Sequence, residues 1–297
     1  MVTNLMKINR LLCLVVILEL VSAVSIHGQL RARRRGVPNA QNVEKQRIAG
    51  LDVAVWKPVG SAPAPLVVFS HGFRGCNTQT VFLMDALADA GYLVVAPNHK
   101  DASCGGRGGL SRAEEPFRDP LSWTDKTYKD RATDVSRLLD GLRADKQWNN
   151  RIDWARVGLA GHSLGGYTVL GSAGAWPAWK LSVVRAVLAL SPYCDPFVQH
   201  GNLETISVPV MYQGGTRDVG ITPTVKRLGE GCYAKTSAPA YFVEFDKAGH
   251  FAWTNLVADY QQPIVHYSVA FFDRFLRGDS KVDLTQRLSA VSDLRSK

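Results

Sequence analysis

A short apolar run that ends in a glycine-flanked serine constrains this chain more than any other feature. Residues 157–160 read Val-Gly-Leu-Ala, and the chain continues Gly-His-Ser-Leu-Gly-Gly with the serine at position 163, before a helix-like segment at 167–173. A strand, a sharp turn with serine at its apex and a helix form the context of a nucleophile elbow. Glycine is expected on both sides of Ser163 because side chains there would collide with the neighbouring strand and helix.

The glycine–serine pattern alone is weak support for a nucleophile elbow, since the pattern arises by chance in about one chain in ten of this length. The remaining chain alternates strand-like and helix-like segments. Strands are predicted over residues 51–56, 66–69, 92–96, 157–160, 183–190, 208–212 and 240–245, and helices over residues 80–90, 126–143, 167–173 and 264–276. This alternation predicts an α/β fold with a mainly parallel central sheet and helices on both faces.

The longer connections between predicted elements indicate how open the site is to a substrate. The segment between the strands at 183–190 and 208–212 is short, so we expect no large cap domain. Residues 98–125 contain no clear element and are predicted to form a loop at the rim of the site.

Polar side chains follow two later strands of the predicted sheet. Asp218 comes after the strand at 208–212, and His250 comes after the strand at 240–245. Ligands of such sheets bind at the carboxyl ends of the strands. A serine hydroxyl needs a base within hydrogen-bond reach, and that base needs an orienting acid. The order serine, acid, histidine therefore predicts Ser163 as nucleophile, His250 as base and Asp218 as orienting acid.

Other residues compete for two of these roles. Asp195 also follows a strand and is an alternative acid. Asp246 lies only four positions before His250, which is too close in sequence to orient the histidine. The chain has seven histidines, and His250 is favoured because it comes after the last predicted strand, directly behind a glycine, whereas His266 lies in the last predicted helix.

An acyl-transfer site also needs donors for the developing oxyanion. Leu164 directly follows the serine, and Ser-His-Gly-Phe at residues 70–73 follows the strand at 66–69. The backbone N–H groups of Phe73 and Leu164 are therefore the predicted oxyanion hole. Trp253 is predicted to bind substrate, because it lies three residues after His250. Further candidates for the pocket wall are Phe73, Trp123 and Tyr193.

These motifs together resemble the α/β-hydrolase superfamily. Within it, Ser-His-Gly-Phe, Gly-His-Ser-Leu-Gly-Gly, the Gly-Gly-x-x-Asp turn and Gly-His-Phe are similar to the branch of platelet-activating-factor acetylhydrolases, cutinase-like polyester hydrolases and dienelactone-hydrolase-like proteins. The resemblance covers about residues 50–278. It implies an α/β-hydrolase catalytic domain over residues 49–278, with the triad and oxyanion hole on the residues named above. Dienelactone hydrolases proper use a cysteine nucleophile, so Ser163 favours ester hydrolysis.

The expected function is that of a secreted serine carboxylesterase that forms an acyl-enzyme on short-chain or polymeric esters. No metal or cofactor is expected. One alternative is a phospholipid acylhydrolase of the platelet-activating-factor type. Another is a catalytically silent binding protein, because a fold does not fix a function.

The N-terminus has the pattern of an export signal. Lys7 and Arg10 precede an apolar stretch at 11–20 and small residues at 21–23, so residues 1–28 are predicted to be a cleaved signal peptide. The protein is then secreted or periplasmic, and its mature form has no transmembrane span. An uncleaved N-terminal anchor is the alternative.

Much of the formal net charge of +9 lies near the N-terminus, where arginine occupies positions 31 and 33–35. Residues 29–48 are predicted to be a basic disordered arm, with binding to an anionic polymer or lipid headgroup as the alternative. No basic face interleaved with aromatic residues points to nucleic acid. Residues 279–297 are predicted to be a C-terminal tail. The oligomeric state stays open.

The cysteines fit an oxidising compartment. Of five cysteines, only Cys13 lies within the predicted signal, and the other four form an even set that suggests two disulfides. Four cysteines allow three pairings. The order of strands favours Cys76–Cys104 and Cys194–Cys232. None has Cys-x-x-Cys spacing, which argues against a zinc site.

Overall fold

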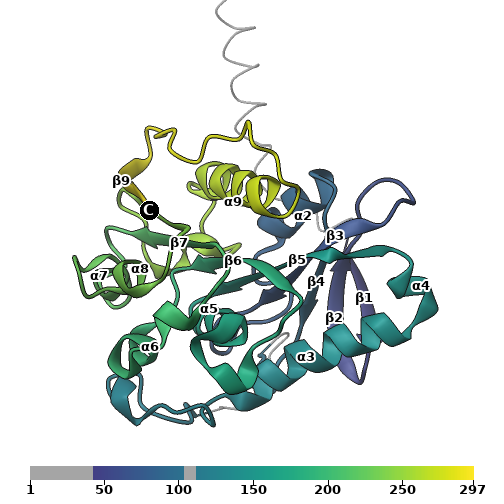
Figure 1. The fold of residues 1–297 in the computed structure, drawn as a ribbon, viewed down its shortest axis with the longest axis horizontal. Helices are drawn as coiled ribbons and strands as arrows, with labels where there is room; N and C mark the ends of the chain where they lie inside the picture. Colours follow the sequence, from purple (N-terminus) through teal and green to yellow (C-terminus); the bar gives the residue numbers. More distant parts are fainter. Residues whose placement is uncertain (1–42, 104–111) are drawn as a thin grey trace, which may run out of the picture. The chain divides into compact units, whose positions relative to one another are not determined.

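The computed structural model describes residues 43–103 and 112–297, and these form a mixed β-sheet covered by helices on both faces (Figure 1). The hydrogen-bonded strand order is β1-β2-β4-β3-β5-β6-β7-β8-β9. The six strands from β4 to β8 in this order run parallel. They are β3 (Ala64–Ser70), β4 (Leu93–Pro97), β5 (Ile152–His162), β6 (Val184–Leu190), β7 (Val210–Gly215) and β8 (Ala240–Phe245). The antiparallel strands are β1 (Val43–Ile48), β2 (Leu51–Trp56) and β9 (Val291–Ser296).

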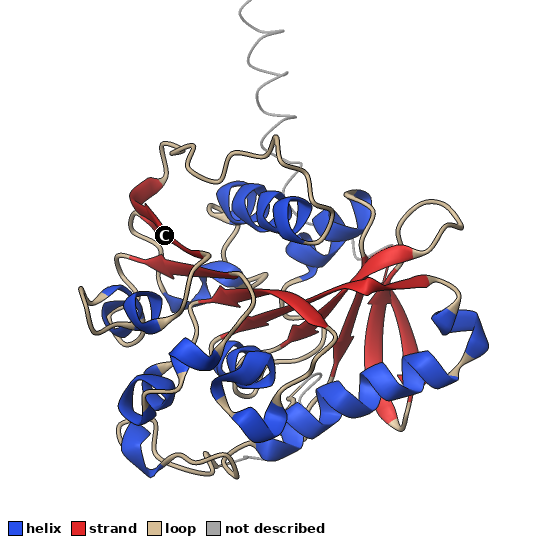
Figure 2. Cartoon of the chain, in the orientation of Figure 1, coloured by secondary structure: helices blue, strands red, loops and turns tan. Residues whose placement is uncertain are grey.

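Two pairs of helices enclose the sheet (Figure 2). Helices α2 (Val81–Asp89) and α9 (Gln261–Phe275) pack on one face, and α3 (Lys129–Ala144) and α5 (Leu164–Leu170) pack on the other. Shorter helices are α4 (Lys146–Asn149), α6 (Asp195–His200), α7 (Thr222–Lys226) and α8 (Cys232–Lys235). Short turns of 3-10 or π-helix are η3 (Pro120–Ser122), η4 (Gly171–Ala175), η5 (Pro177–Trp179), η6 (Leu203–Thr205) and η7 (His250–Trp253).

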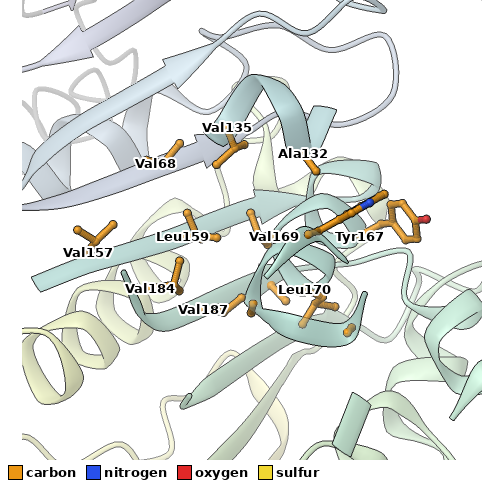
Figure 3. Close-up of a cluster of buried hydrophobic side chains, with 14 of the residues drawn as sticks. Val68, Ala132, Val135, Val157, Leu159, Tyr167, Val169, Leu170, Val184 and Val187 are labelled. Carbon is orange, nitrogen blue, oxygen red and sulfur yellow. The ribbon is translucent and has the colours of Figure 1, made fainter. Parts of the chain in front are cut away.

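The core is built from strands that are apolar on both faces, as expected for a parallel sheet covered on both sides. On the α3 and α5 side, Val68, Leu159 and Val187 of adjacent strands meet Val135 of α3 and Leu170 of α5 (Figure 3). Alternate residues of the same strands face α2 and α9. The long apolar runs therefore form the central strands because they can be buried on both faces.

The α/β-hydrolase fold class predicted from the sequence is confirmed. Each predicted strand and long helix is present within a few residues of its predicted bounds. Between β6 and β7 the chain has only α6 and η6, so no cap domain is inserted there.

The structure corrects the predicted boundaries at both ends. Residues 43–48, assigned to the arm 29–48, form β1, and residues 291–296, assigned to the tail 279–297, form β9. Both strands are polar and half exposed, so they lack the apolar run that predicts a strand. Pairing with a neighbour decides their state: β1 folds back on β2 through Ala49 and Gly50, which both have positive φ, as in a two-residue hairpin turn.

Other predictions at the N-terminus lie outside the described residues, namely the signal peptide at 1–28 and the arginine run at positions 31–35. Of the helices in the described ranges, none is both long and apolar enough to cross a membrane.

One predicted disulfide is present. Cys194 and Cys232 are joined and link the start of α6 to α8, with Cα atoms 6.3 Å apart. Cys104 lies outside the described residues, so its pairing with Cys76 stays a prediction.

Candidate active site

The turn at Ser163 has the backbone that the glycine pattern predicts. Ser163 lies between β5 and α5 with φ of 55° and ψ of −117°. A Cβ atom at Gly161 would lie 2.2 Å from the carbonyl oxygen of Gly165, and one at Gly165 would lie 1.9 Å from that of Ser70. No side chain fits at either position, so the glycines allow β3, β5 and α5 to approach closely enough to form the turn.

Ser163, His250 and Asp218 lie in line, with the His250 ring hydrogen-bonded to the serine and in ion-pair contact with the carboxylate. The Nε2 atom of His250 lies 3.0 Å from Ser163 Oγ, and its Nδ1 lies 3.2 Å from Asp218 Oδ1. Because a carboxylate only accepts, Nδ1 carries the proton and Nε2 is free to accept from the serine hydroxyl. Asp218 follows β7 and is 3% exposed, whereas the His250 side chain is 28% exposed.

The alternative acids lie elsewhere. Asp195 is the first residue of α6, and Asp246 points to the surface, where it pairs with Lys247 at 3.7 Å. Among the described residues, Asp218 supplies the only carboxylate that contacts the His250 ring.

Ser191 belongs to the same cluster, and the sequence reasoning missed it. Its hydroxyl donates a hydrogen bond to Asp218 Oδ2 and lies 2.9 Å from His250 Nδ1. Ser191 directly follows β6 and has φ of 43°. It therefore lies at the same sheet edge as Ser163, Asp218 and His250, and this position after a strand was the available signal.

Replacing Ser191 with alanine is expected to lower kcat/KM for an activated ester about tenfold, because a hydrogen bond to a charged acceptor contributes about 1.5 kcal/mol. Steady-state kinetics on a p-nitrophenyl ester measure this effect. Thr222→Val removes a longer bond to Asp218 Oδ2, of 3.3 Å, and should have a smaller effect. An unchanged kcat/KM for Ser191→Ala would mean that the hydroxyl does not support the Asp218–His250 pair.

His162, inside the elbow, holds the segment that carries His250. Its Nε2–H donates to the carbonyl oxygen of His250 at 2.9 Å, and its Nδ1 accepts from Gln79 Nε2 at 3.0 Å. Burial, together with the nearby His250 ring, lowers the pKa of His162 to about 3. His162 is therefore neutral at ordinary pH and acts as a hydrogen-bond bridge rather than as a second base.

The predicted oxyanion donors flank the serine. A Cβ at Gly72 would lie 3.4 Å from Ser163 Cβ, so the loop of residues 70–74, here called the oxyanion loop, contacts the elbow directly. Gly72 N donates to Gln79 Oε1 at 3.1 Å, which ties this loop to the same glutamine that contacts His162. The N–H of Phe73 makes no hydrogen bond to another described residue. This arrangement leaves the Phe73 N–H available to a bound ligand.

An open apolar cleft of about 890 Å³ leads to Ser163. Phe73, Phe117 and Tyr193 line it, with Phe117 packed edge-to-face on both of the other rings. Other apolar lining residues are exposed at the surface: Val219 (80%), Leu256 (80%) and Phe251 (58%). Phe73 and Tyr193, both named from the sequence, thus face the cleft.

The predicted substrate contact of Trp253 is wrong. Trp253 is fully buried, donates from Nε1 to Gln213 Oε1 at 3.0 Å and stacks on His162, and it does not line the cleft. The η7 turn directs it into the core beneath His250. Trp123 is also fully buried and is absent from the cleft lining.

Within residues 43–103 and 112–297, no cluster of three or more His, Cys, Asp or Glu side chains has the arrangement of a metal site. The site offers a serine hydroxyl, a histidine base beside a carboxylate, and the Phe73 N–H donor of the oxyanion loop next to an apolar cleft.

Comparisons with known proteins give matches to two family models and to several individual proteins. A family model described as PET hydrolase-like matches residues 121–289, and one described as platelet-activating factor acetylhydrolase, isoform II, matches residues 47–123. The chain is similar to cutinase est2 of Thermobifida alba, with 25% identity over 72% of this chain and 61% of the cutinase. It is also similar to lipase 1 of Moraxella sp. (strain TA144), with 27% identity over 54% of this chain and 47% of the lipase.

A third relative is the platelet-activating factor acetylhydrolase of Gallus gallus, with 27% identity over 36% of this chain and 35% of that protein. The chain thus spans less than two thirds of the length of each of these three relatives.

Proposed function

This chain belongs to the PET hydrolase-like family, and on that premise we propose that it is a serine carboxylic-ester hydrolase. The observation that carries the proposal is the arrangement of Ser163, His250 and Asp218 along an open apolar cleft, with Ser163 hydrogen-bonded to His250 and His250 in ion-pair contact with Asp218.

The proposed reaction has two steps. Ser163 Oγ attacks the ester carbonyl while His250 Nε2 takes its proton, and Asp218 stabilises the imidazolium that forms. The N–H groups of Phe73 and Leu164 donate to the oxyanion. As the C–O bond to the alcohol breaks, His250 returns the proton to the leaving oxygen. Water, deprotonated by His250, then attacks the acyl-enzyme, and the acid leaves as the Ser163 hydroxyl is restored.

The cleft favours substrates with apolar groups next to the ester. Its lining is aromatic near Ser163, and it opens beside exposed apolar residues with no covering domain among the described residues. We therefore propose short-chain or polymeric esters as substrates. The PET hydrolase-like family match and the similarity to a cutinase support the polymeric class.

A phospholipid acylhydrolase is the second candidate. The match of the platelet-activating factor acetylhydrolase family to residues 47–123 favours it, because this range contains the oxyanion loop. The chemistry at Ser163 would be the same, so the two candidates differ only in the ester that the cleft accepts.

We also propose that the protein is exported. Residues 1–28 have the pattern of a signal peptide, and the Cys194–Cys232 disulfide suits an oxidising compartment.

A substrate panel combined with active-site labelling tests the proposal. The purified chain is assayed on p-nitrophenyl acetate and butyrate, the matching p-nitroanilides, a polyester film and a phosphatidylcholine with a short sn-2 chain. We expect ester turnover and one fluorophosphonate adduct, mapped to Ser163 by peptide mass spectrometry. Faster hydrolysis of the anilides would favour a peptidase. Absence of both turnover and adduct would favour a binding protein on the same fold.

A further inference from the structure

A buried ion pair lies behind the oxyanion loop, and none of the steps of the proposed reaction uses its charged groups directly. Arg131 of α3 is fully buried, and its Nε and Nη2 atoms lie 3.0 and 3.3 Å from the two carboxylate oxygens of Asp101. Burying two charges costs about as much as their attraction returns, so such a pair is a poor source of stability. Its position therefore suggests another role.

The ion pair contacts the oxyanion loop on both sides of Phe73. Arg131 Nη1 donates to the carbonyl oxygen of His71 at 2.8 Å, and Nη2 donates to that of Gly72 at 3.3 Å. Asp101 Oδ2 accepts from the backbone N–H of Arg74 at 3.0 Å. Three successive backbone groups around Phe73 are thus held by one guanidinium–carboxylate pair.

The donors on the Gly72 carbonyl oxygen, Arg131 Nη2 among them, fix the direction of the Phe73 N–H. The Gly72 carbonyl and the Phe73 N–H belong to one planar trans peptide, so they point in opposite directions. The Gly72 oxygen also accepts from Gly75 N at 2.9 Å and from His71 Nδ1 at 2.8 Å. Donors on that oxygen both fix the peptide plane and polarise it, which makes the N–H a stronger donor.

The protonation state of His71 is consistent with its role as a donor to the Gly72 oxygen. Its Nε2 accepts from the backbone N–H of His99 at 3.1 Å, so the ring proton is on Nδ1, where it can be donated to Gly72. Burial, followed by the charge of Arg131, lowers the pKa of His71 well below its usual range, so the ring is neutral.

We propose that Arg131, held by Asp101, is a positioning residue that aims and polarises the Phe73 N–H toward the oxyanion. The guanidinium acts through the backbone and does not touch the substrate. The inference rests on the proposed ester hydrolysis, and it adds a buried residue of α3 to the machinery of that reaction.

Arg131→Lys tests the inference. An ammonium group keeps the charge beside Asp101 but cannot span two carbonyl oxygens as a guanidinium does. Since loss of one oxyanion donor costs about 10²–10³ in kcat, we expect a misaimed donor to lower kcat by about 10- to 100-fold. Rates are normalised to the sites titrated by a fluorophosphonate, so that unfolded protein does not count.

Inhibitor binding separates positioning from general loss of structure. A trifluoromethyl ketone adds to a serine and forms an oxyanion, whereas the corresponding carbinol does not. For Arg131→Lys the ketone should bind more weakly by about the same factor as kcat falls, while carbinol binding stays within about twofold. Equal weakening of both ligands, or wild-type kcat per titrated site, would overturn the inference.

Two further variants complete the test. Arg156→Lys is the matched control, because Arg156 pairs with Asp153 near the start of β5, away from the cleft, and it should retain wild-type kcat and ketone binding. If Arg131→Lys does not fold, Asp101→Asn decides, since it loses the charge that holds Arg131 and should show the same split between ketone and carbinol. A wild-type chain that neither hydrolyses esters nor binds the ketone would overturn the proposed function as well.

Discussion

Replacing Ser163 with alanine is expected to lower kcat for p-nitrophenyl butyrate by at least about 10⁴-fold. The change removes the atom that forms the acyl-enzyme, whereas His250, Asp218 and the oxyanion donors stay in place. The small remaining rate would come from water that attacks an ester held in the cleft. Alanine has a Cβ like serine, so the positive φ at this position is no less tolerated, and the melting temperature should change little.

Asp218→Asn should lower kcat by a similar factor, about 10⁴-fold, because an amide favours the wrong tautomer of His250.

For Ser163→Ala, the matched control is Ser182→Ala, since Ser182 is exposed on the segment before β6. Rates are measured at equal concentrations of folded protein. Turnover by Ser163→Ala equal to that of the wild type would contradict the assignment of the nucleophile.

The free energy of unfolding is expected to fall steeply below about pH 6.5, the usual pKa of histidine. His71, His99 and His162 are buried, and burial is the largest cause that lowers the pKa of each. As the pH falls, the unfolded chain therefore takes up protons at these rings before the folded chain does. Protonation then favours unfolding, so the stability is fully present above about pH 6.5 and decreases below it.

The expected loss of unfolding free energy is large. Each histidine contributes a slope of up to about 1.4 kcal/mol per pH unit, so the three together remove up to about 6 kcal/mol between pH 7 and 5. At lower pH, Asp130 and Asp134 oppose the trend, because burial raises their pKa values and they bind protons more readily in the folded chain. Urea unfolding at pH 7, 6 and 5 measures the slope above that range.

His99→Gln should remove about one third of this slope, whereas His266→Gln, at an exposed position on α9, should leave it unchanged. A free energy of unfolding that stays constant from pH 7 to 5 would show that the buried rings accept protons in the folded state.

The sequence by itself determined the sheet core and the positions of Ser163, Asp218 and His250 after the strands of the sheet. The run 66–69 is apolar throughout and the run 183–190 is apolar except for Arg185, a pattern that favours strands buried on both faces. In a parallel sheet, residues that follow such strands gather at one edge, which brings distant polar residues together without knowledge of side-chain contacts. The glycines around Ser163 added the backbone crowding that predicts the turn.

Only the tertiary structure decided the details that depend on partners far along the chain. Trp253 could have faced the cleft or the core, and its position next to a predicted base did not distinguish these. The polar strands β1 and β9 form because a neighbouring strand satisfies their backbone. Arg131 and Asp101 lie on different elements 30 positions apart, so nothing local reveals that they meet behind Gly72. Apolar periodicity is a property of the local sequence, whereas the direction of a side chain after a turn and the pairing of buried charges depend on packing between distant segments of the chain.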